Sequence, residues 1–422
     1  MDCESRLKRF NEKVEESYDF RPSPSELQTV CTDLLECSNS LTAADRVRSL
    51  KSMGYFCLGP QISFPMRIEC ENCFKAVSDS KSLALIIQDL RPMLLQVKNS
   101  RLSEQGRFKQ QELSGLNPKK GLAFKEDEIR SNWAQQGGTR TVSLFYVVLG
   151  QLKIKDVSSN LGWIVPGILN LMDDTSDLEG IKLQGAVLLE RFLTETVGFS
   201  SQPQFDFSGT GLFKVFEPIL TSMWYHFPQS TDPNLTKKIW GTVFPTLIAL
   251  YRVEFITRPE LLYENVSKFL SEVLLQVTLP RIAISYPDLT IDTVDRVGAC
   301  VQILGERSVI HLQRAIHVFG DYLIRSVQIQ DLKNILHSVF TVLKAFIDNC
   351  PKDRVIAHRY NLLACALVAC ERTLTEQKLQ EDENVQRECR SLIKALEVKG
   401  VVWTEEERQL MKSRVSSLDL EI

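Results

Sequence analysis

Four acidic residues follow one another closely in the segment LMDDTSDLEGIKLQGAVLLERFL, residues 171–193. Asp173 and Asp174 are adjacent, and Asp177 and Glu179 come soon after them. Carboxylates gathered in this way can hold a divalent cation, act as a catalytic acid and base, or begin a helix. The three roles need different neighbouring residues, so the surrounding sequence distinguishes between them.

The chemical roles do not find the neighbours that they need. A calcium loop requires glycine at position 6 and glutamate at position 12. Counted from Asp173, these positions hold Leu178 and Gln184. A catalytic pair of adjacent aspartates would need other side chains to converge on one substrate, and no obvious helper is near. The calcium site is therefore excluded, and a catalytic pair is disfavoured.

The start of a helix explains the acids better. Ser176 followed by Glu179 has the pattern of a capping box, and acids suit the positive end of a helix. The apolar positions beyond step by three and four residues, at Leu178, Ile181, Gly185, Leu188 and Phe192. We therefore expect a capped helix in which Gly185 lets another backbone approach closely. If Asp173 caps it, Asp173→Ala should cost about 0.5–2 kcal/mol. The surplus of acids leaves a partner-binding surface open as the alternative.

A CxxC pair, Cys70 and Cys73, raises the question of a metal or redox site. A structural zinc site needs four ligands, often as two such pairs. There is no second CxxC, and all five histidines lie at residue 226 or beyond. A redox CxxC usually opens a helix next to strands. Metal and redox functions are therefore disfavoured, although an enzyme or metal protein using Cys70, Cys73 or the acids near Asp173 stays open.

Other catalytic signatures are missing from the sequence. It contains no HExxH, Walker loop, GxSxG or GxGxxG motif. The net charge of −3 gives no basic excess of the kind that nucleic-acid binding needs. We therefore expect a protein with no catalytic residues, no cofactor and no direct contact with nucleic acid.

Helical periodicity dominates the elements that would position these residues. With 44% hydrophobic residues, the chain of 422 residues can bury a core. Three successive segments show apolar residues at helical spacing, namely Val309, Leu312, Ile316, Phe319 and Leu323, then Leu332, Leu336, Val339, Leu343 and Phe346, then Ile356, Tyr360, Leu363 and Leu367. Alternating strand patterns and hairpin turns are absent, so the predicted fold class is all-α.

Capping patterns mark several helix starts. Ser23 and Glu26 form one capping box with Pro24 at the first helical position, and Thr404 and Glu407 form another. Both predict a helix that begins immediately after the hydroxyl-bearing residue.

Helix pairs recur at roughly 40 residues, which is typical of helical repeat arrays. Pro166, Pro218 and Pro245 fall inside helical patterns, where proline is expected to kink a helix. Kinked, irregular helices in such an array predict a HEAT-like α-solenoid.

One segment differs in composition from the rest. Residues 101–125 are rich in basic residues and glycine, with few apolar anchors. This composition predicts a loop or linker between an N-terminal helical region, residues 1–100, and a main array, residues 126–422. A solvated loop is the simpler interpretation, and docking of an acidic partner is the alternative.

The cysteines and the termini predict the compartment. The 11 cysteines lie mostly in apolar helical patterns, and the N-terminus lacks the apolar core of a signal peptide. Free thiols without export indicate a reducing compartment, the cytoplasm or the nucleus. No stretch is apolar enough to span a membrane, and neither end carries a lipidation motif.

In LGWIVPGILNLMDDTSDLEGIKLQGAVLLERFL, a proline-containing helix leads into a paired-aspartate turn, then a lysine, a glycine and a leucine-rich helix. This order resembles the signature region of the Tel-two-interacting protein two family. The matching positions here are Pro166, Asp173, Asp174, Lys182 and Gly185.

The following stretch, FSGTGLFKVFEPILTSMWYHFP, also resembles the family, through Gly211, Leu212, Val215 and Phe216. ILGERSVIHLQRAIHVFGDYLI is similar to the family's C-terminal repeats, more loosely. The resemblance covers roughly residues 160–330, whereas the first 125 residues match only in helical character. The length suits a fungal member.

The resemblance implies a non-catalytic scaffold subunit of the TTT complex, together with the Tel-two protein and Tel-two-interacting protein one. That complex is a co-chaperone of the ninety-kilodalton heat-shock chaperone. It matures the phosphatidylinositol-3-kinase-related kinases of telomere maintenance, DNA-damage response and TOR signalling. The nine matching residues become candidates for partner binding. A generic HEAT-type adaptor in transport or phosphatase assembly is the alternative.

Overall fold

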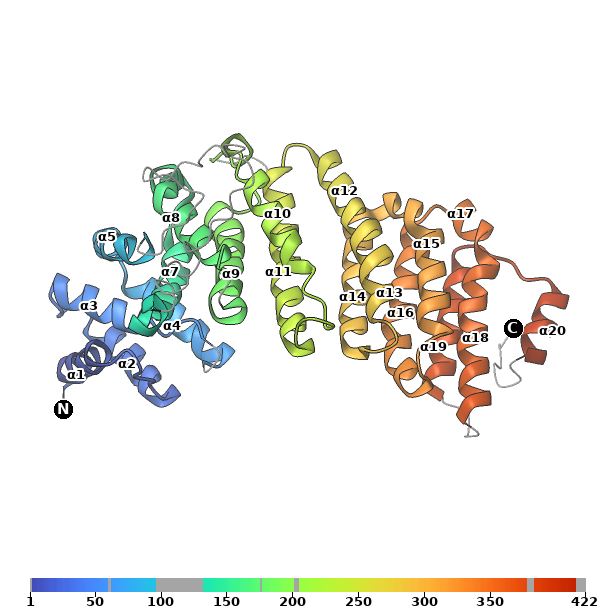
Figure 1. Ribbon diagram of the computed structural model, residues 1–422, viewed down its shortest axis with the longest axis horizontal. Helices are drawn as coiled ribbons and strands as arrows, with labels where there is room; N and C mark the ends of the chain where they lie inside the picture. Colours follow the sequence, from blue (N-terminus) through green and yellow to red (C-terminus); the bar gives the residue numbers. More distant parts are fainter. Residues whose placement is uncertain are drawn as a thin grey trace, which may run out of the picture. The chain divides into compact units, whose positions relative to one another are not determined.

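The computed structural model describes residues 2–59, 62–95, 132–174, 177–200, 205–377 and 383–414. Within these ranges every regular element is a helix, so the predicted all-α class is confirmed. By their contacts the helices form two compact units (Figure 1). Unit 1 comprises Met1–Tyr225 and Ile239–Glu254, and unit 2 comprises His226–Lys238 and Phe255–Ile422.

Unit 1 begins with five helices, coloured blue in Figure 1: α1 (Cys3–Glu16), α2 (Pro24–Cys37), α3 (Ala43–Gly54), α4 (Phe64–Val77) and α5 (Ser80–Leu95). α1 packs on α2 and α3, and α2 packs on α4. The rings of Phe10, Phe20 and Phe56 meet edge to face at centroid distances of 5.9–6.2 Å. Such contacts close the core around the N-terminus.

The rest of unit 1 consists of η1 (Ala134–Gly138), α7 (Thr139–Gln151), η2 (Ile154–Asp156), α8 (Val157–Met172), η3 (Leu178–Lys182), α9 (Leu183–Arg191), η4 (Phe192–Val197), η5 (Ser208–Thr210), α10 (Phe213–Trp224) and α11 (Pro233–Glu254). Residues 233–238, the first six of α11, belong to unit 2. The predicted linker, residues 101–125, lies outside the described residues. The helices on its two sides share one unit, since α5 packs on both α7 and α8.

Two tryptophans hold α10 against α11 within unit 1. Trp224 and Trp240 are fully buried, and their rings stack with centroids 4.9 Å apart. The indole N–H of Trp240 donates to the Trp224 carbonyl at 2.8 Å. The pair combines a large buried apolar area with a satisfied polar group.

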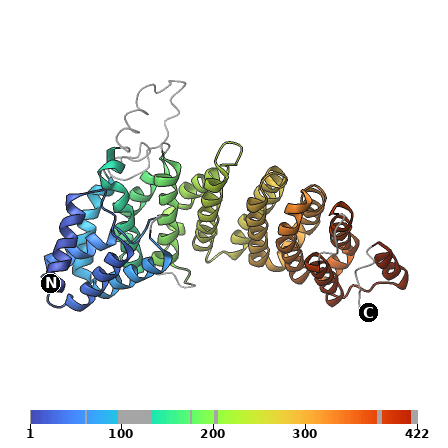
Figure 2. The ribbon, with the colours of Figure 1, turned by 90° about the horizontal axis from the view of Figure 1, so that it is seen from below.

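Unit 2 contains α12 (Pro259–Lys268), η6 (Phe269–Thr278), α13 (Leu279–Ile282), α14 (Pro287–Leu304), η7 (Gly305–His311), α15 (Leu312–His317), η8 (Val318–Ile324), α16 (Ile329–Asn349), α17 (Lys352–Ala357), α18 (Arg359–Gln377), α19 (Glu383–Val398) and α20 (Glu405–Arg414). Its helices follow one another in sequence order along the unit (Figure 2, yellow to red).

The helices of unit 2 pack in two layers. α14, α16 and α19 pack one against the next, while η6 packs on α14, η8 packs on α16, and α18 packs on both α16 and α19. The helices of the first layer begin at residues 287, 329 and 383, so the repeat is uneven rather than a uniform 40 residues. Stacked helix pairs are the building unit of helical repeat proteins. A solenoid running through the whole chain stays a prediction.

Two of the three predicted apolar faces in this unit are confirmed. All five residues of the face on α16 are buried, as are four of the five on the preceding run, where Val309 is half-buried. The third face was wrong at its start. α17 ends at Ala357 and α18 begins at Arg359, so Ile356 and Tyr360 belong to different helices. Tyr360 is 51% exposed, and its hydroxyl donates to Glu407 at 2.5 Å.

Both predicted capping boxes are confirmed. The Ser23 hydroxyl accepts from the Glu26 backbone, and the Glu26 carboxylate accepts from the Ser23 backbone. Thr404 and Glu407 make the same reciprocal pair at 3.2 and 2.7 Å before α20. Local sequence alone sets these helix starts, because both partners lie within one turn.

The three internal prolines lie where the patterns place them. Pro166, Pro218 and Pro245 are inside α8, α10 and α11. The kinks that we expect at these residues stay predictions.

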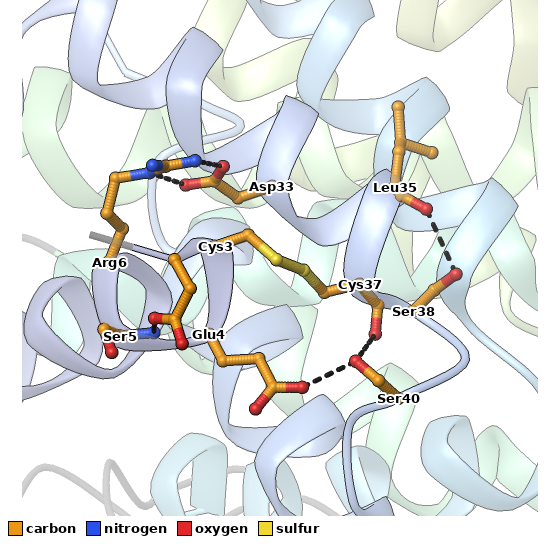
Figure 3. Close-up of a disulfide and its surroundings, with 10 residues drawn as sticks. Cys3, Glu4, Ser5, Arg6, Asp33, Leu35, Cys37, Ser38 and Ser40 are labelled. Atoms are coloured by element: carbon orange, nitrogen blue, oxygen red, sulfur yellow. Dashed lines mark hydrogen bonds and ion pairs between the residues drawn. A yellow bond between two sulfur atoms is a disulfide. The ribbon is translucent and has the colours of Figure 1, made fainter.

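A disulfide between Cys3 and Cys37 joins α1 to α2 (Figure 3). The expected free thiols are therefore wrong for this pair, while the other nine cysteines are free and buried. Beside the disulfide, Arg6 makes a two-pronged contact with the buried carboxylate of Asp33. The reducing compartment stays a prediction.

Candidate functional site

The acidic turn between α8 and η3 is held by two successive carboxylate caps. The Asp174 side chain is fully buried and accepts the Asp177 backbone N–H at 2.7 Å. The Asp177 side chain in turn accepts the Gly180 backbone N–H at 2.7 Å. Each aspartate thus satisfies a donor three residues ahead, as an N-cap does.

The structure corrects the predicted cap. Asp177, in an extended conformation, is the N-cap of η3, whereas Ser176, the predicted cap, lies outside the described residues. Asp173 ends α8 instead of beginning the next helix, and its backbone N–H donates to the Leu169 carbonyl at 2.9 Å. The stability effect expected for Asp173 therefore belongs to Asp177.

Gly185 confirms the predicted close approach of two backbones. A Cβ added there would lie 2.6 Å from Met172 Cγ and 2.8 Å from the Met172 backbone nitrogen. Ile181, Leu188 and Phe192 are buried, as expected of the face that contains Gly185. α9 therefore rests directly on the end of α8, and only glycine fits at the crossing.

Arg191, a residue that sequence reasoning missed, attaches the end of α9 to α4 and α7. Its guanidinium donates to Glu71 of α4 at 2.8 Å and lies 4.6 Å from the centroid of the Tyr146 ring in α7. A Cβ on Gly150 would lie 2.3 Å from Arg191 Nη2, so this glycine leaves the guanidinium its space. Arg191 and Glu71 are 120 residues apart, and no local pattern connects them.

The second motif segment begins α10. Gly211 has a left-handed backbone with φ of +71°, which favours glycine. The Leu212 carbonyl accepts from the backbone N–H groups of Val215 and Phe216, both at 3.0 Å. Leu212 and Phe216 are buried, so this segment anchors the first turn of the helix.

The nine candidate residues divide by exposure. Five are buried, three are half-buried, and Gly211 is exposed; the buried ones are Pro166, Asp174, Gly185, Leu212 and Phe216, and the half-buried ones are Asp173, Lys182 and Val215. Buried motif residues hold the chain's own helices together. A partner can reach mainly the polar turn around Asp173, Asp177 and Lys182.

Cys70 and Cys73 lie on the buried face of α4 and meet thiols from other elements. The Cys31 thiol donates to the Cys70 sulfur at 3.8 Å, and the Cys73 thiol donates to the Cys31 carbonyl at 3.4 Å. Hydrogen bonding to Cys70 and Cys73, and then burial, raises the pKa of Cys31, whereas hydrogen bonding to Cys70 and then burial raises the pKa of Cys57. Among the described residues, no three side chains are grouped so as to hold a metal ion.

A serine–histidine pair in unit 2 was also missed. Ser267 Oγ of α12 lies 2.7 Å from His311 Nε2 of η7. Burial, aided by the nearby Arg314, lowers the pKa of His311 to about 4, so the ring is neutral at physiological pH. Only 6% of His311 is exposed, which leaves a substrate little access to the ring. The pair serves as a packing contact between two helices.

Fold and site together define an all-helical protein whose motif residues mainly support its own helix packing. In the part of the chain that the structure describes, no helix is long and apolar enough to cross a membrane. The model of the Tti2 family matches residues 66–330. TEL2-interacting protein 2 of Saccharomyces cerevisiae is 32% identical over 392 residues, covering 90% of this chain and 91% of the yeast protein.

The chain therefore belongs to the Tti2 family, which confirms the family that the sequence motifs indicated. The match begins well before residue 160, so it includes helices of unit 1 that showed only helical character by inspection. No solved structure matches the chain.

Proposed function

We propose that this chain is a non-catalytic scaffold subunit of the TTT complex, bound to the organism's Tel-two protein and Tel-two-interacting protein one. The observation that carries the proposal is the similarity, along 90% of the chain, to a yeast protein named for its interaction with TEL2. A similarity of this extent covers both units and not one motif alone.

The same family membership supports a finer role as part of the proposal. The complex assists the ninety-kilodalton heat-shock chaperone in maturing phosphatidylinositol-3-kinase-related kinases, in the cytoplasm and the nucleus. Telomere maintenance, DNA-damage response and TOR signalling then depend on the chain through these kinases. The half-buried Asp173 and Lys182 in the acidic turn are candidate contacts with a partner.

The surface of unit 2 supports a binding role. Large apolar side chains are exposed on several of its elements, namely Ile284, Ile310, Val398, Val402 and Leu410. Single exposed apolar side chains are ordinary on protein surfaces, so a part for these five in binding would need them to form one patch. Stacked helix pairs also present extended faces to a partner.

Gentle purification of the tagged chain from its native cell, followed by mass spectrometry, tests the proposal. We expect the other two TTT subunits in near-equal amount and the large kinases in lesser amount. A tagged helical-repeat protein of similar abundance is the control. Recovery of transport factors or a phosphatase instead would favour the generic HEAT-type adaptor.

Depletion of the chain tests the finer role separately. Steady-state levels of the kinases should fall over several cell generations while their transcripts stay constant. Unchanged kinase levels with intact TTT assembly would reject the role in kinase maturation and leave the subunit assignment in place.

A further inference from the structure

The disulfide between Cys3 and Cys37 lies at one end of the helix pair formed by α1 and α2 (Figure 3). Cys3 is the first residue of α1, and Cys37 is the last residue of α2. Cys3 is half-buried, whereas only 5% of Cys37 is exposed. All 11 cysteines lie in the described ranges, and the nine that are free are buried. Cys3 is therefore the cysteine that a reagent in solvent reaches most easily.

The first turn of α1 carries polar side chains. Glu4, Ser5 and Arg6 are exposed, and the first deeply buried apolar residue of the helix is Leu7. The Ser40 hydroxyl donates to Glu4 Oε1 at 2.6 Å, in an exposed position where a hydrogen bond contributes little. Because apolar burial begins only at Leu7, the disulfide and polar contacts hold this turn in place.

One of these polar contacts depends on where the turn lies. Arg6 Nε donates to Asp33 Oδ2 at 2.8 Å, and Arg6 Nη2 pairs with the other carboxylate oxygen (Figure 3). Asp33 is only 2% exposed, so its carboxylate is costly to bury without a cation. The disulfide keeps the turn that carries Arg6 beside Asp33. Cleavage of the bond would therefore weaken this charge pair as well.

The second half of α1 has attachments of its own. Phe10 and Val14 are buried, and Arg140 of α7 donates to the Val14 carbonyl at 3.0 Å. Asn11 Nδ2 donates to Ser49 Oγ of α3 at 2.8 Å, and both residues are buried. Loss of the disulfide would thus loosen the first turn while the rest of α1 stays packed on unit 1.

A dithiol can open the bond by exchange. One thiolate of the dithiol attacks Cys3 Sγ, the accessible sulfur, and forms a mixed disulfide there. This step expels Cys37 as a thiolate, which takes a proton from water. The second thiol of the dithiol, deprotonated, then attacks its neighbour's sulfur, closes a disulfide within the dithiol and releases Cys3, which also takes up a proton. The protein disulfide gains two electrons, and the dithiol loses two.

We propose that the Cys3–Cys37 disulfide is a redox-sensitive switch that controls the order of the first turn of α1. In the oxidised chain the turn holds Arg6 on Asp33. In the reduced chain the turn detaches, and Asp33 becomes accessible to water. The reductant is a protein dithiol of the thioredoxin class, which the cytoplasm and the nucleus supply. The inference does not depend on the proposed partners, because it concerns unit 1 alone.

The test uses the full-length chain, purified without reductant, and dithiothreitol as the dithiol. Differential alkylation followed by peptide mass spectrometry identifies the free cysteines before and after reduction. Hydrogen exchange of residues 5–8 reports on the first turn, and exchange of residues 11–16 reports on the half of α1 that should not respond. Cys3→Ser mimics the reduced state. Cys300→Ala, which removes a free buried thiol of unit 2, is the matched control.

We expect dithiothreitol to free only Cys3 and Cys37. Glutathione disulfide should restore the bond, with two molecules of glutathione as the product. Exchange of residues 5–8 should become at least about tenfold faster on reduction, as in local opening of a helix end, while residues 11–16 change by less than about twofold. Cys3→Ser should exchange fast with and without dithiothreitol, and Cys300→Ala should respond as the wild type does. If Cys3→Ser does not fold, the two redox states of the wild type decide.

Four results would overturn the inference. Free Cys3 and Cys37 after treatment with glutathione disulfide would mean that the bond does not form. A bond that dithiothreitol reduces only in denaturant would be a permanent crosslink. Unchanged exchange of residues 5–8 on reduction would mean that the bond does not control the turn. Release of the buried thiols on reduction would mean that the whole unit needs the bond. None of these results affects the copurification that tests the proposed function, so the two proposals can fail separately.

Discussion

Gly185 in unit 1 and Gly320 in unit 2 both lie where two helices meet, but the surroundings differ. A Cβ at Gly185 would approach the Met172 backbone nitrogen to 2.8 Å, whereas one at Gly320 would meet only Cys365 Sγ, at 3.6 Å. The first position closes a buried crossing, and the second lies in the lining of an open groove. The same residue type thus permits a close crossing at one place and lines an open groove at the other.

The difference teaches how to interpret the family motif. Gly185 belongs to the motif, yet it supports the fold, because its face is fully covered by α8. The open groove beside Gly320 lies between η8, in the segment that resembles the family only loosely, and α18, which lies beyond that segment. Most of the matching motif residues are buried and are constrained by packing. The surface available to a partner has to be found from exposure and charge instead.

Gly185→Leu should cause the largest loss of stability and is the most direct test of the difference between the two glycines. The side chain would collide with the α8 backbone, which cannot move aside as a flexible side chain can, so we expect a loss of about 3 kcal/mol. Gly162→Leu in α8 is the matched control, because nothing lies within 4 Å of a Cβ there. Urea unfolding measures both, and equal stability of the two variants would contradict the close crossing.

Acid should destabilise unit 2 through His311. Its pKa is about 4 in the folded chain, below the ordinary value of 6.5, so the unfolded chain takes up the proton first as pH falls. Stability is full above about pH 6.5 and is lost as the pH falls toward 4, by about 2 kcal/mol at pH 5. Urea titrations of wild type and His311→Gln at about pH 7.5 and pH 5 measure it.

His311→Gln keeps a hydrogen-bonding side chain beside Ser267 and removes the titration. The variant should therefore lose less stability between the two pH values than the wild type does. The same loss in both proteins would assign the acid sensitivity to other groups.

Arg191→Ala should weaken the attachment of α9 to α4 and α7 in unit 1. It removes the ion pair with Glu71 and the contact with Tyr146, and it leaves Glu71 mostly buried, so we expect a loss of about 2 kcal/mol. Arg307→Ala in unit 2 is the control, because its ion pair with Glu260 is exposed and should contribute less than about 1 kcal/mol. Comparable losses would contradict the role assigned to burial.

Asp177→Ala should remove the N-cap of η3, the element that leads into α9. One backbone N–H of Gly180 loses its acceptor, at a cost of about 1 kcal/mol in thermal or urea unfolding. Asp177→Asn should retain most of the stability, since an amide oxygen can accept the same bond. A loss from Asp173→Ala that exceeds the loss from Asp177→Ala would restore the original expectation.

Gly320→Ala should have the smallest effect on stability. It tests the Gly320 side of the contrast with Gly185. The added methyl meets Cys365 Sγ at an ordinary distance, so stability should change by less than about 1 kcal/mol, as for other tolerated glycine replacements. Differential scanning calorimetry of Gly320→Ala against Gly185→Ala gives the contrast directly. A large loss of stability in Gly320→Ala would mean that the helices at Gly320 approach each other as closely as α8 and α9 do at Gly185.

Much of the helical framework was predictable, and its errors are local. The capping boxes at Ser23 and Thr404 and the buried face of α16 follow from residues within one or two turns. The face through Ile356 and Tyr360 failed because a break at His358 separates α17 from α18 without proline or glycine. The N-cap is Asp177, one residue after the predicted Ser176, because several oxygen-bearing side chains in this turn can act as caps.

The sequence by itself determined the all-α class, the family and the close approach at Gly185, because periodicity, caps and motifs are encoded over short spans. Only the tertiary structure decided what each face packs against. Arg191 pairs with Glu71 across 120 residues, the free thiol of Cys31 donates to the Cys70 sulfur across 39, and η8 and α18 enclose a groove. An apolar stripe states that a surface is buried, whereas the identity of its neighbour depends on how the helices stack.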